Sequence, residues 1–163
     1  MKAYSYITRE LYNEVKNNGR VYPKLGVSCY ASSENIYKAF QRRFGKQSFF
    51  AWNKDIGKDI IPQEGAEYVY VELDLPDNIC RLTNYLNWCD LITIYMGHDK
   101  EPSEGELKLM LENLGFKDFR ALEQLWEDIY AIDENDVNQI MYDYLDISFI
   151  KSAKGTNKTK KTY

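Results

Sequence analysis

The chain has little of what many catalytic and metal-binding sites are built from. Among its 163 residues there is one histidine, His98, and there are three cysteines. A cysteine hydrolase needs a histidine beside its nucleophile, and a histidine-rich metal site needs several imidazoles, so the composition argues against both. The sequence also has no phosphate-binding loop, no dinucleotide fingerprint and no recognisable serine–histidine–aspartate set.

The chain has neither a signal peptide nor an apolar run of about twenty residues. Its cysteines, Cys29, Cys80 and Cys89, are odd in number and form no Cys-x-x-Cys pair. We therefore expect a cytoplasmic protein that makes no contact with membranes and keeps its cysteines reduced, at least two of them buried.

Positive charge is scarce except at the C-terminal end. The formal net charge is −4, which argues against a protein that grips a nucleic acid backbone. Residues 151–163 carry five lysines and no acid. They predict a basic flexible tail after a single domain of residues 1–150, and this tail is the one place where a weak contact with nucleic acid is expected.

The apolar patterns predict an α+β domain whose central sheet, mixed or antiparallel, is flanked by helices. The clearest strand is 67–75, where Val69, Val71, Leu73 and Leu75 alternate with more polar residues. Further strands are expected at 2–8, 27–31, 48–52, 79–82, 138–144 and 147–150. Helices are expected from Thr8 to Gly19 and from Ser32 or Ser33 to Gly45, where the threonine and serines act as caps and the glycines as stops. Further helices are expected over 84–96 and after Ser103 and Asp118.

Polar side chains gather where the predicted strands meet helices. Ser5, Tyr6 and Thr8 end the first strand, Tyr30 and Ser32 end the second, and Gln139 opens a late one. Helix N-termini attract anions, so these positions would suit a nucleotide. The alternative is structural, with Thr8 and Ser32 as helix caps and the tyrosines as packing residues. Glu72 and Asp74 are likewise either a catalytic carboxylate pair or a solvated strand face.

The chain resembles a bacterial and phage domain family of unknown function over most of its length. The resemblance is carried by YSYITRELYNEV (4–15), Tyr37, Ala39 and Phe40, FAW (50–52), VELDLPDN (71–78), LTNYLNW (82–88), LWEDIYAID (125–133) and NQIMYDYLDISFIKSA (138–153). The order and spacing of these segments match better than any single motif does.

A more distant resemblance is to small ADP-ribosyltransferase-type proteins, whose first strand often ends in His-Ile-Thr. Tyr6, Ile7 and Thr8 fall at that motif, Tyr30 and Ser32 at the second-strand position, and Gln139 at the late Glu or Gln. The resemblance implies NAD as cofactor, with Gln139 and Tyr6 in the catalytic positions and Ser5, Thr8, Tyr30 and Ser32 around the ligand. Tyr6 replaces the usual histidine, and Gln139 supplies no negative charge for an oxocarbenium-like transition state.

The sequence therefore predicts an ADP-ribosyltransferase-like domain that binds NAD or has a degenerate site. The alternative is a non-catalytic protein-binding module, such as a phage or mobile-element inhibitor of a host or defence protein, acting through its aromatic and acidic surface. Neither the protein partner nor the oligomeric state can be read from the residues.

Overall fold

A six-stranded antiparallel sheet forms the centre of the molecule. The computed structural model describes residues 1–24, 34–57, 67–95, 102–117 and 119–155. In spatial order the strands are β5 (Cys80–Asn84), β6 (Asn138–Tyr142), β3 (Phe49–Trp52), β1 (Lys2–Thr8), β4 (Tyr68–Asp74) and β8 (Ile150–Gly155). All neighbouring strands run antiparallel, which confirms the predicted α+β class.

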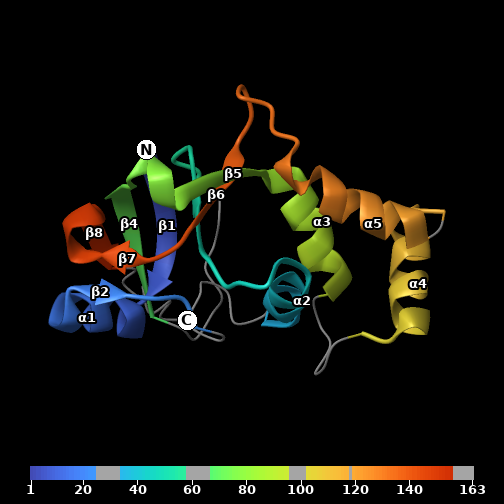
Figure 1. The fold of residues 1–163 in the computed structure, drawn as a ribbon, viewed down its shortest axis with the longest axis horizontal. Helices are drawn as coiled ribbons and strands as arrows, with labels where there is room; N and C mark the ends of the chain where they lie inside the picture. Colours follow the sequence, from blue (N-terminus) through green and yellow to red (C-terminus); the bar gives the residue numbers. More distant parts are fainter. Residues whose placement is uncertain (25–33, 58–66, 96–101, 118, 156–163) are drawn as a thin grey trace, which may run out of the picture.

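Helices cover both faces of this sheet. Helix α1 (Arg9–Asn18) lies beside β1 and β4, whereas α2 (Glu34–Phe44), α3 (Tyr85–Tyr95), α4 (Glu104–Asn113) and α5 (Phe119–Glu127) gather at the other end of the molecule (Figure 1). Within the described residues, the short 3-10 helices η2 (Asp77–Ile79), η3 (Asp128–Tyr130) and η4 (Ile147–Phe149) join neighbouring elements.

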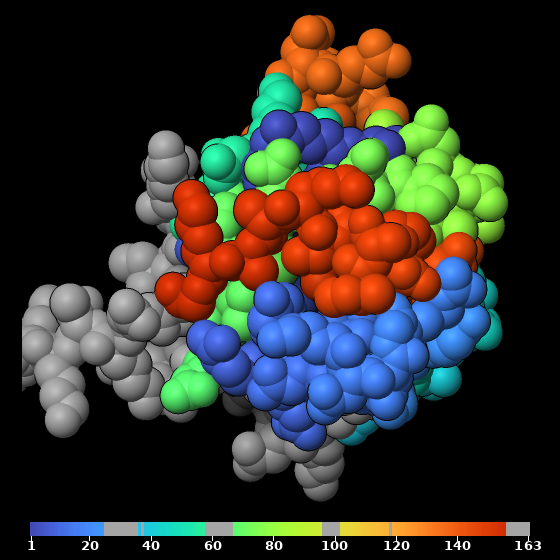
Figure 2. Space-filling view, turned by 90° about the vertical axis from the view of Figure 1, so that its left-hand side faces the viewer, coloured from blue at the N-terminus to red at the C-terminus, as the bar shows by residue number. Residues whose placement is uncertain are grey.

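The first hydrophobic core lies between the sheet and α1. The alternation of side chains along β1 and β4 directs Ala3, Ile7, Val69 and Val71 to this face, where Leu11 and other residues of α1 cover them. A small second sheet of β2 (Arg20–Val21) and β7 (Leu145–Asp146) closes this core. Figure 2 shows this side of the molecule, with α1 and β2 directly against the C-terminal segment that includes β7 and β8.

The second core lies on the opposite face, over β3 and β6. Phe50 and Met141 are registered partners on these two strands, and they pack against α2, α3 and α5. Trp88 is buried at the centre of this core. Its indole Nε1 donates to Thr83 Oγ1 at 2.8 Å, and Thr83 Oγ1 donates to the Gln139 carbonyl at 2.8 Å. This relay ties α3 to β5 and β6.

The helix ends confirm the capping residues that the sequence predicts. Thr8 accepts a hydrogen bond from the Leu11 amide, and Ser103 accepts one from the Glu106 amide. Gly19 and Gly45 follow α1 and α2 with φ of 80° and 72°, in the left-handed region that favours glycine. The predicted strand 27–31 and the predicted caps Ser32, Ser33 and Asp118 lie outside the described residues.

Two predictions near the C-terminal end are wrong. Residues 147–149 form η4 rather than a strand, because Asp146 accepts hydrogen bonds from the Ser148 amide and hydroxyl and so starts a tight turn. Residues 151–155, assigned above to a flexible tail, belong to β8 and pair with β4. Main-chain hydrogen bonds to β4 hold this edge strand, so it needs no buried apolar side chains. Its lysines and small residues therefore lack the alternating apolar pattern by which a strand is recognised in a sequence.

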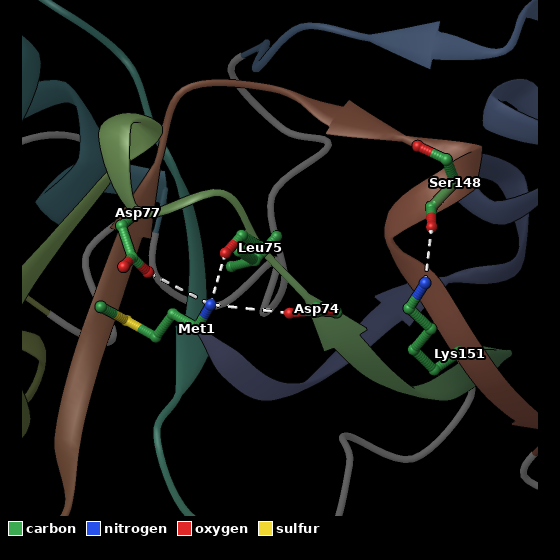
Figure 3. Close-up of polar contacts among 6 residues, drawn as sticks. All are labelled: Met1, Asp74, Leu75, Asp77, Ser148 and Lys151. Atoms are coloured by element: carbon green, nitrogen blue, oxygen red, sulfur yellow. Dashed lines mark hydrogen bonds and ion pairs between the residues drawn. The ribbon is translucent and has the colours of Figure 1, made fainter.

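Polar contacts also fix the ends of the neighbouring strands β1 and β4. The Met1 amino group donates to the Leu75 carbonyl at 2.5 Å and lies 3.2 Å from Asp77 and 3.6 Å from Asp74 (Figure 3). On the neighbouring segment, Lys151 donates to the Ser148 carbonyl at 3.3 Å. The start of β1 is thereby tied to the end of β4.

The cysteines are less buried than the sequence predicts. Cys80 and Cys89 are both free thiols and half-buried, and Cys29 lies outside the described residues. Burial raises the pKa of the Cys80 thiol to about 11, and it also raises the pKa of the Cys89 thiol.

Replacing Thr83 with valine tests the relay beneath α3. The Thr83→Val variant keeps the shape of the side chain but leaves the Trp88 N–H and the Gln139 carbonyl without this buried partner, which should lower the free energy of unfolding by about 1–3 kcal/mol. Urea unfolding measures the change. The exposed Thr93→Val variant is the control and should stay within about 0.5 kcal/mol of the parent; equal values for the two variants would contradict the relay.

Thiol labelling tests the environment of Cys80. Only the thiolate reacts, and a pKa of about 11 instead of 9.0 leaves roughly a hundredfold less thiolate at pH 8. In a Cys29→Ser, Cys89→Ser variant, labelling by a disulfide reagent should be at least that much slower in the native protein than in urea. Its rate should keep rising with pH above 9. Rapid native labelling at pH 8 would show that Cys80 has an ordinary pKa.

Candidate functional site

Aromatic side chains occupy the middle of the sheet on the face opposite α1. The registered pairs Tyr6–Tyr70 and Thr8–Tyr68 place these side chains of β1 and β4 on one face. Tyr4 is registered with Trp52 of β3, which brings Trp52 to the same face. We call Tyr4, Tyr6, Tyr68, Tyr70 and Trp52 together the tyrosine face.

Tyr6 stands at the centre of the tyrosine face. Its ring centroid lies 4.7 Å from that of Tyr70 and 6.4 Å from those of Trp52 and Tyr68, the last two in edge-to-face geometry. Tyr4 and Tyr70 are nearly parallel, with centroids 6.4 Å apart. Tyr6, Trp52 and Tyr68 are buried, whereas Tyr4 and Tyr70 are only partly buried. The rings that a ligand can reach are therefore Tyr4 and Tyr70.

The segment after β3 crosses this face and is held by the tyrosine hydroxyls. Tyr6 Oη donates to the Gly57 carbonyl at 2.8 Å, and Tyr70 Oη donates to Asp55 Oδ1 at 2.5 Å. The Gly57 amide donates back to Tyr70 Oη at 3.3 Å. A Cβ on Gly57 would lie 2.3 Å from the Tyr70 ring, so only glycine allows this approach. We call residues 53–57 the strap.

Burial and a carboxylate keep the two phenols protonated. Burial raises the pKa of Tyr6, and the nearby Asp55 charge adds to the shift. The pKa of Tyr70 rises further, through burial and the hydrogen bond to Asp55. Both hydroxyls therefore remain neutral donors through the physiological range, and neither is a general base.

Charged side chains flank the two exposed rings. Lys2 Nζ lies 2.9 Å from Glu72 Oε1 and 5.6 Å from the centroid of the Tyr4 ring. The hydrogen bond to Glu72 is the main reason that the pKa of Lys2 is raised. Lys154 of β8 is the registered neighbour of Tyr70. The site thus offers two partly exposed aromatic rings between two lysines.

Glu72 and Asp74, considered above as a catalytic pair, each have a cationic partner. Glu72 is paired with Lys2, and Asp74 lies 3.6 Å from the Met1 amino group. Their side chains are 34% and 65% exposed. The arrangement is that of a solvated, ion-paired strand face.

The structure brings only part of the predicted site together. Tyr6 lies in the tyrosine face, but Thr8 uses its hydroxyl to cap α1. Ser5 points to the opposite face, where its Oγ donates to the Phe50 carbonyl at 2.9 Å and is buried. Tyr30 and Ser32 lie outside the described residues.

Gln139 is not next to Tyr6. It lies on β6, and β3 runs between β6 and β1, which separates the strands of the two residues by about 10 Å. Trp52 is the link, because it is the registered neighbour of Gln139 and also packs edge-on against Tyr6. Gln139 is 7% exposed, so little of it is accessible to a ligand on the tyrosine face.

Sequence reasoning missed Trp52, Tyr70 and Asp55 as parts of this site. A usable signal was present in the strand 67–75, whose second face carries Tyr68 and Tyr70 at a spacing of two. The sequence could not predict the strand register that places Tyr68 and Tyr70 beside Tyr6, since register depends on pairing between distant segments.

In the described parts of the chain, no group of three or more His, Cys, Asp and Glu side chains is arranged to hold a metal ion. His98, the single histidine, is outside those parts. Among the helices that the structure describes, none has the length and apolar character needed to cross a membrane.

Gly57→Ala tests the strap against the Tyr70 ring. The added methyl group would overlap the ring, so the free energy of unfolding of the variant should be about 1–3 kcal/mol lower than that of the parent. In a Tyr70→Leu background the same change should cost much less, because the overlapping ring atoms are gone. Urea unfolding of the four proteins gives the coupling.

Gly105→Ala in α4 is the matched control, since a Cβ there meets nothing within 4 Å. It should leave the stability unchanged or raise it by about 0.4–1 kcal/mol. Additive effects of Gly57→Ala and Tyr70→Leu would mean that the strap does not rest on this ring.

Comparisons with known proteins leave the site without a described counterpart. No protein-family model, curated protein or solved structure matches this chain.

Proposed function

We propose that this domain binds NAD on the tyrosine face, as an ADP-ribosyltransferase-like domain with a degenerate catalytic site. The observation that carries the proposal is the pair of partly exposed rings, Tyr4 and Tyr70, standing nearly parallel on the sheet between Lys2 and Lys154. The ring positions suit a flat heteroaromatic group, and the lysines suit a diphosphate.

Stacking supplies the first contribution to binding. An adenine or nicotinamide ring packed on an aromatic side chain gains about 1–3 kcal/mol, as judged by alanine substitution. The rings of Tyr4 and Tyr70 are held in place by β1 and β4, which are paired along their whole length. Such prearranged rings lose little side-chain entropy when a ligand binds.

The lysines supply the second contribution. Lys2 Nζ is 5.6 Å from the Tyr4 centroid, and the register puts Lys154 beside Tyr70, so both cations are within reach of a ligand stacked on these rings. Lys2 already has Glu72 as a partner, so a diphosphate would share this cation with the carboxylate. Binding should therefore weaken as the salt concentration rises.

The chemistry of the site supports binding without transfer. The late-strand residue is Gln139, whose amide carries no negative charge to stabilise an oxocarbenium-like transition state. Two acids lie beside the reachable rings: Glu72, which is ion-paired with Lys2, and Asp55, which accepts the hydrogen bond of the Tyr70 hydroxyl. We therefore expect NAD to bind and to remain intact.

Titration of the protein with NAD tests this proposal. NAD at about a hundred times its dissociation constant should stabilise the native protein by roughly 2.7 kcal/mol, seen as a higher melting temperature. Calorimetric titration of Tyr4→Ala should show an affinity about 5- to 150-fold weaker, which corresponds to the loss of one stacked ring. Gln139→Ala should weaken binding less, because Gln139 is 7% exposed.

Tyr22→Ala is the control for the loss of a tyrosine ring. Tyr22 is 59% exposed, and its ring packs against Tyr144 beside the small sheet of β2 and β7 rather than on the tyrosine face. It should leave NAD affinity unchanged. No thermal shift at millimolar NAD would reject the proposal in favour of the protein-binding alternative, and release of nicotinamide by the wild-type protein would contradict the degenerate site.

A further inference from the structure

A cavity of about 400 Å³, widely open to solvent, lies among the helices α2, α3, α4 and α5, away from the tyrosine face. Four helices contribute to its wall. The lining residues are Ala39, Arg42 and Arg43 of α2, Tyr95 of α3, Leu107 of α4, and Phe119, Leu122, Glu123 and Trp126 of α5. Its volume falls in the range of sites that hold small organic ligands.

The inner wall of this cavity is apolar and largely aromatic. Tyr95, Leu122 and Trp126 are buried members of the second core, and Phe119 and Leu107 pack against that core. The Tyr95 and Trp126 rings meet edge-on with centroids 6.3 Å apart. A flat apolar group placed here would find ring faces and edges on several sides.

The rest of the lining carries a net positive charge. Two arginines and one glutamate contribute, in a protein whose formal charge is −4. Arg43 donates to both Glu123 oxygens, at 3.2 and 2.5 Å, and its guanidinium carbon lies 5.6 Å from the Trp126 centroid. The hydrogen bonds from Arg43, together with its charge, hold the pKa of Glu123 below its usual value, so the pair stays ionised.

Glu123 and Trp126 therefore orient the Arg43 guanidinium. A guanidinium has five N–H donors, and Glu123 accepts from two of them while the Trp126 ring supports the cation. Arg42 adds a second guanidinium to the same lining. The chemistry that fits is a carboxylate joined to a flat apolar body.

We propose that this cavity binds a small aromatic carboxylate, with the ring against Trp126, Tyr95 and Phe119 and the carboxylate beside Arg42 and Arg43. The site shares no residue with the tyrosine face, so this proposal does not depend on NAD binding. Failure of either proposal leaves the other standing.

The test uses 2-naphthoate as the probe and the neutral 2-naphthalenemethanol as its uncharged match. In calorimetric titration naphthoate should bind at micromolar to millimolar concentration, and the alcohol should bind at least about tenfold more weakly because it lacks the charge-assisted hydrogen bonds. No binding of naphthoate at millimolar concentration, or equal binding of the two probes, would overturn the proposal.

Two kinds of variant locate the binding. Ala39→Leu adds a side chain to the cavity and should abolish naphthoate binding, whereas Ala121→Leu, on α5 outside the lining, should leave it unchanged. Arg42→Gln does not fill the cavity and should weaken naphthoate by about tenfold while leaving the alcohol unaffected. Wild-type affinity in both Ala39→Leu and Arg42→Gln would show that the probe binds elsewhere and would refute the site.

Discussion

The pairing of β1 with β4 is the constraint on which the other features depend. Seven consecutive residues of β1 have registered partners on β4, from Lys2 opposite Asp74 to Thr8 opposite Tyr68. Because strand side chains alternate, this one register decides both faces at once. Ala3, Ile7, Val69 and Val71 are sent towards α1, and Tyr4, Tyr6, Tyr68 and Tyr70 to the other side. If one strand shifted by one residue along the other, its apolar side chains and its tyrosines would exchange faces.

The two cores cover different parts of the sheet. The core against α1 extends across the sheet from β5 to β8, whereas the core under α2, α3 and α5 covers β3 and β6. Between this second core and the lysine-bearing strand β8, the sheet is covered by large rings with polar tips, whose hydroxyls find partners in the strap. Tyrosine suits such a half-covered position, since it combines apolar area with a group that hydrogen-bonds at the boundary with water.

Local signals account for what the sequence predicts correctly. Thr8, Ser103, Gly19 and Gly45 act within a few residues of themselves, so their roles as helix boundaries could be read directly. The strand 67–75 was equally clear, because its alternation lies within one segment. The α+β class followed from the order of such segments.

What could not be predicted depends on distant pairing. Gln139 was expected beside Tyr6, but β3 pairs with both of their strands and places Trp52 between them. Ser5 was assigned to the same site as Tyr6, although consecutive strand residues point to opposite faces. The role of Asp55 depends on how the strap crosses Tyr70, which no local pattern in residues 53–57 records.

The composition of β8 bears on how copies of this protein behave in concentrated solution. Among the strands that the structure describes, β8 pairs with β4 alone, so its outer edge offers main-chain groups to an extended segment that approaches, and such edges are common starting points for aggregation. Residues 151–155 of this strand are all exposed, and two of them, Lys151 and Lys154, are cations. A second copy that added its own β8 would bring lysines close to lysines across the new pair, and like charges facing each other are unfavourable. The sheet can therefore end in an exposed strand and still resist growing from molecule to molecule.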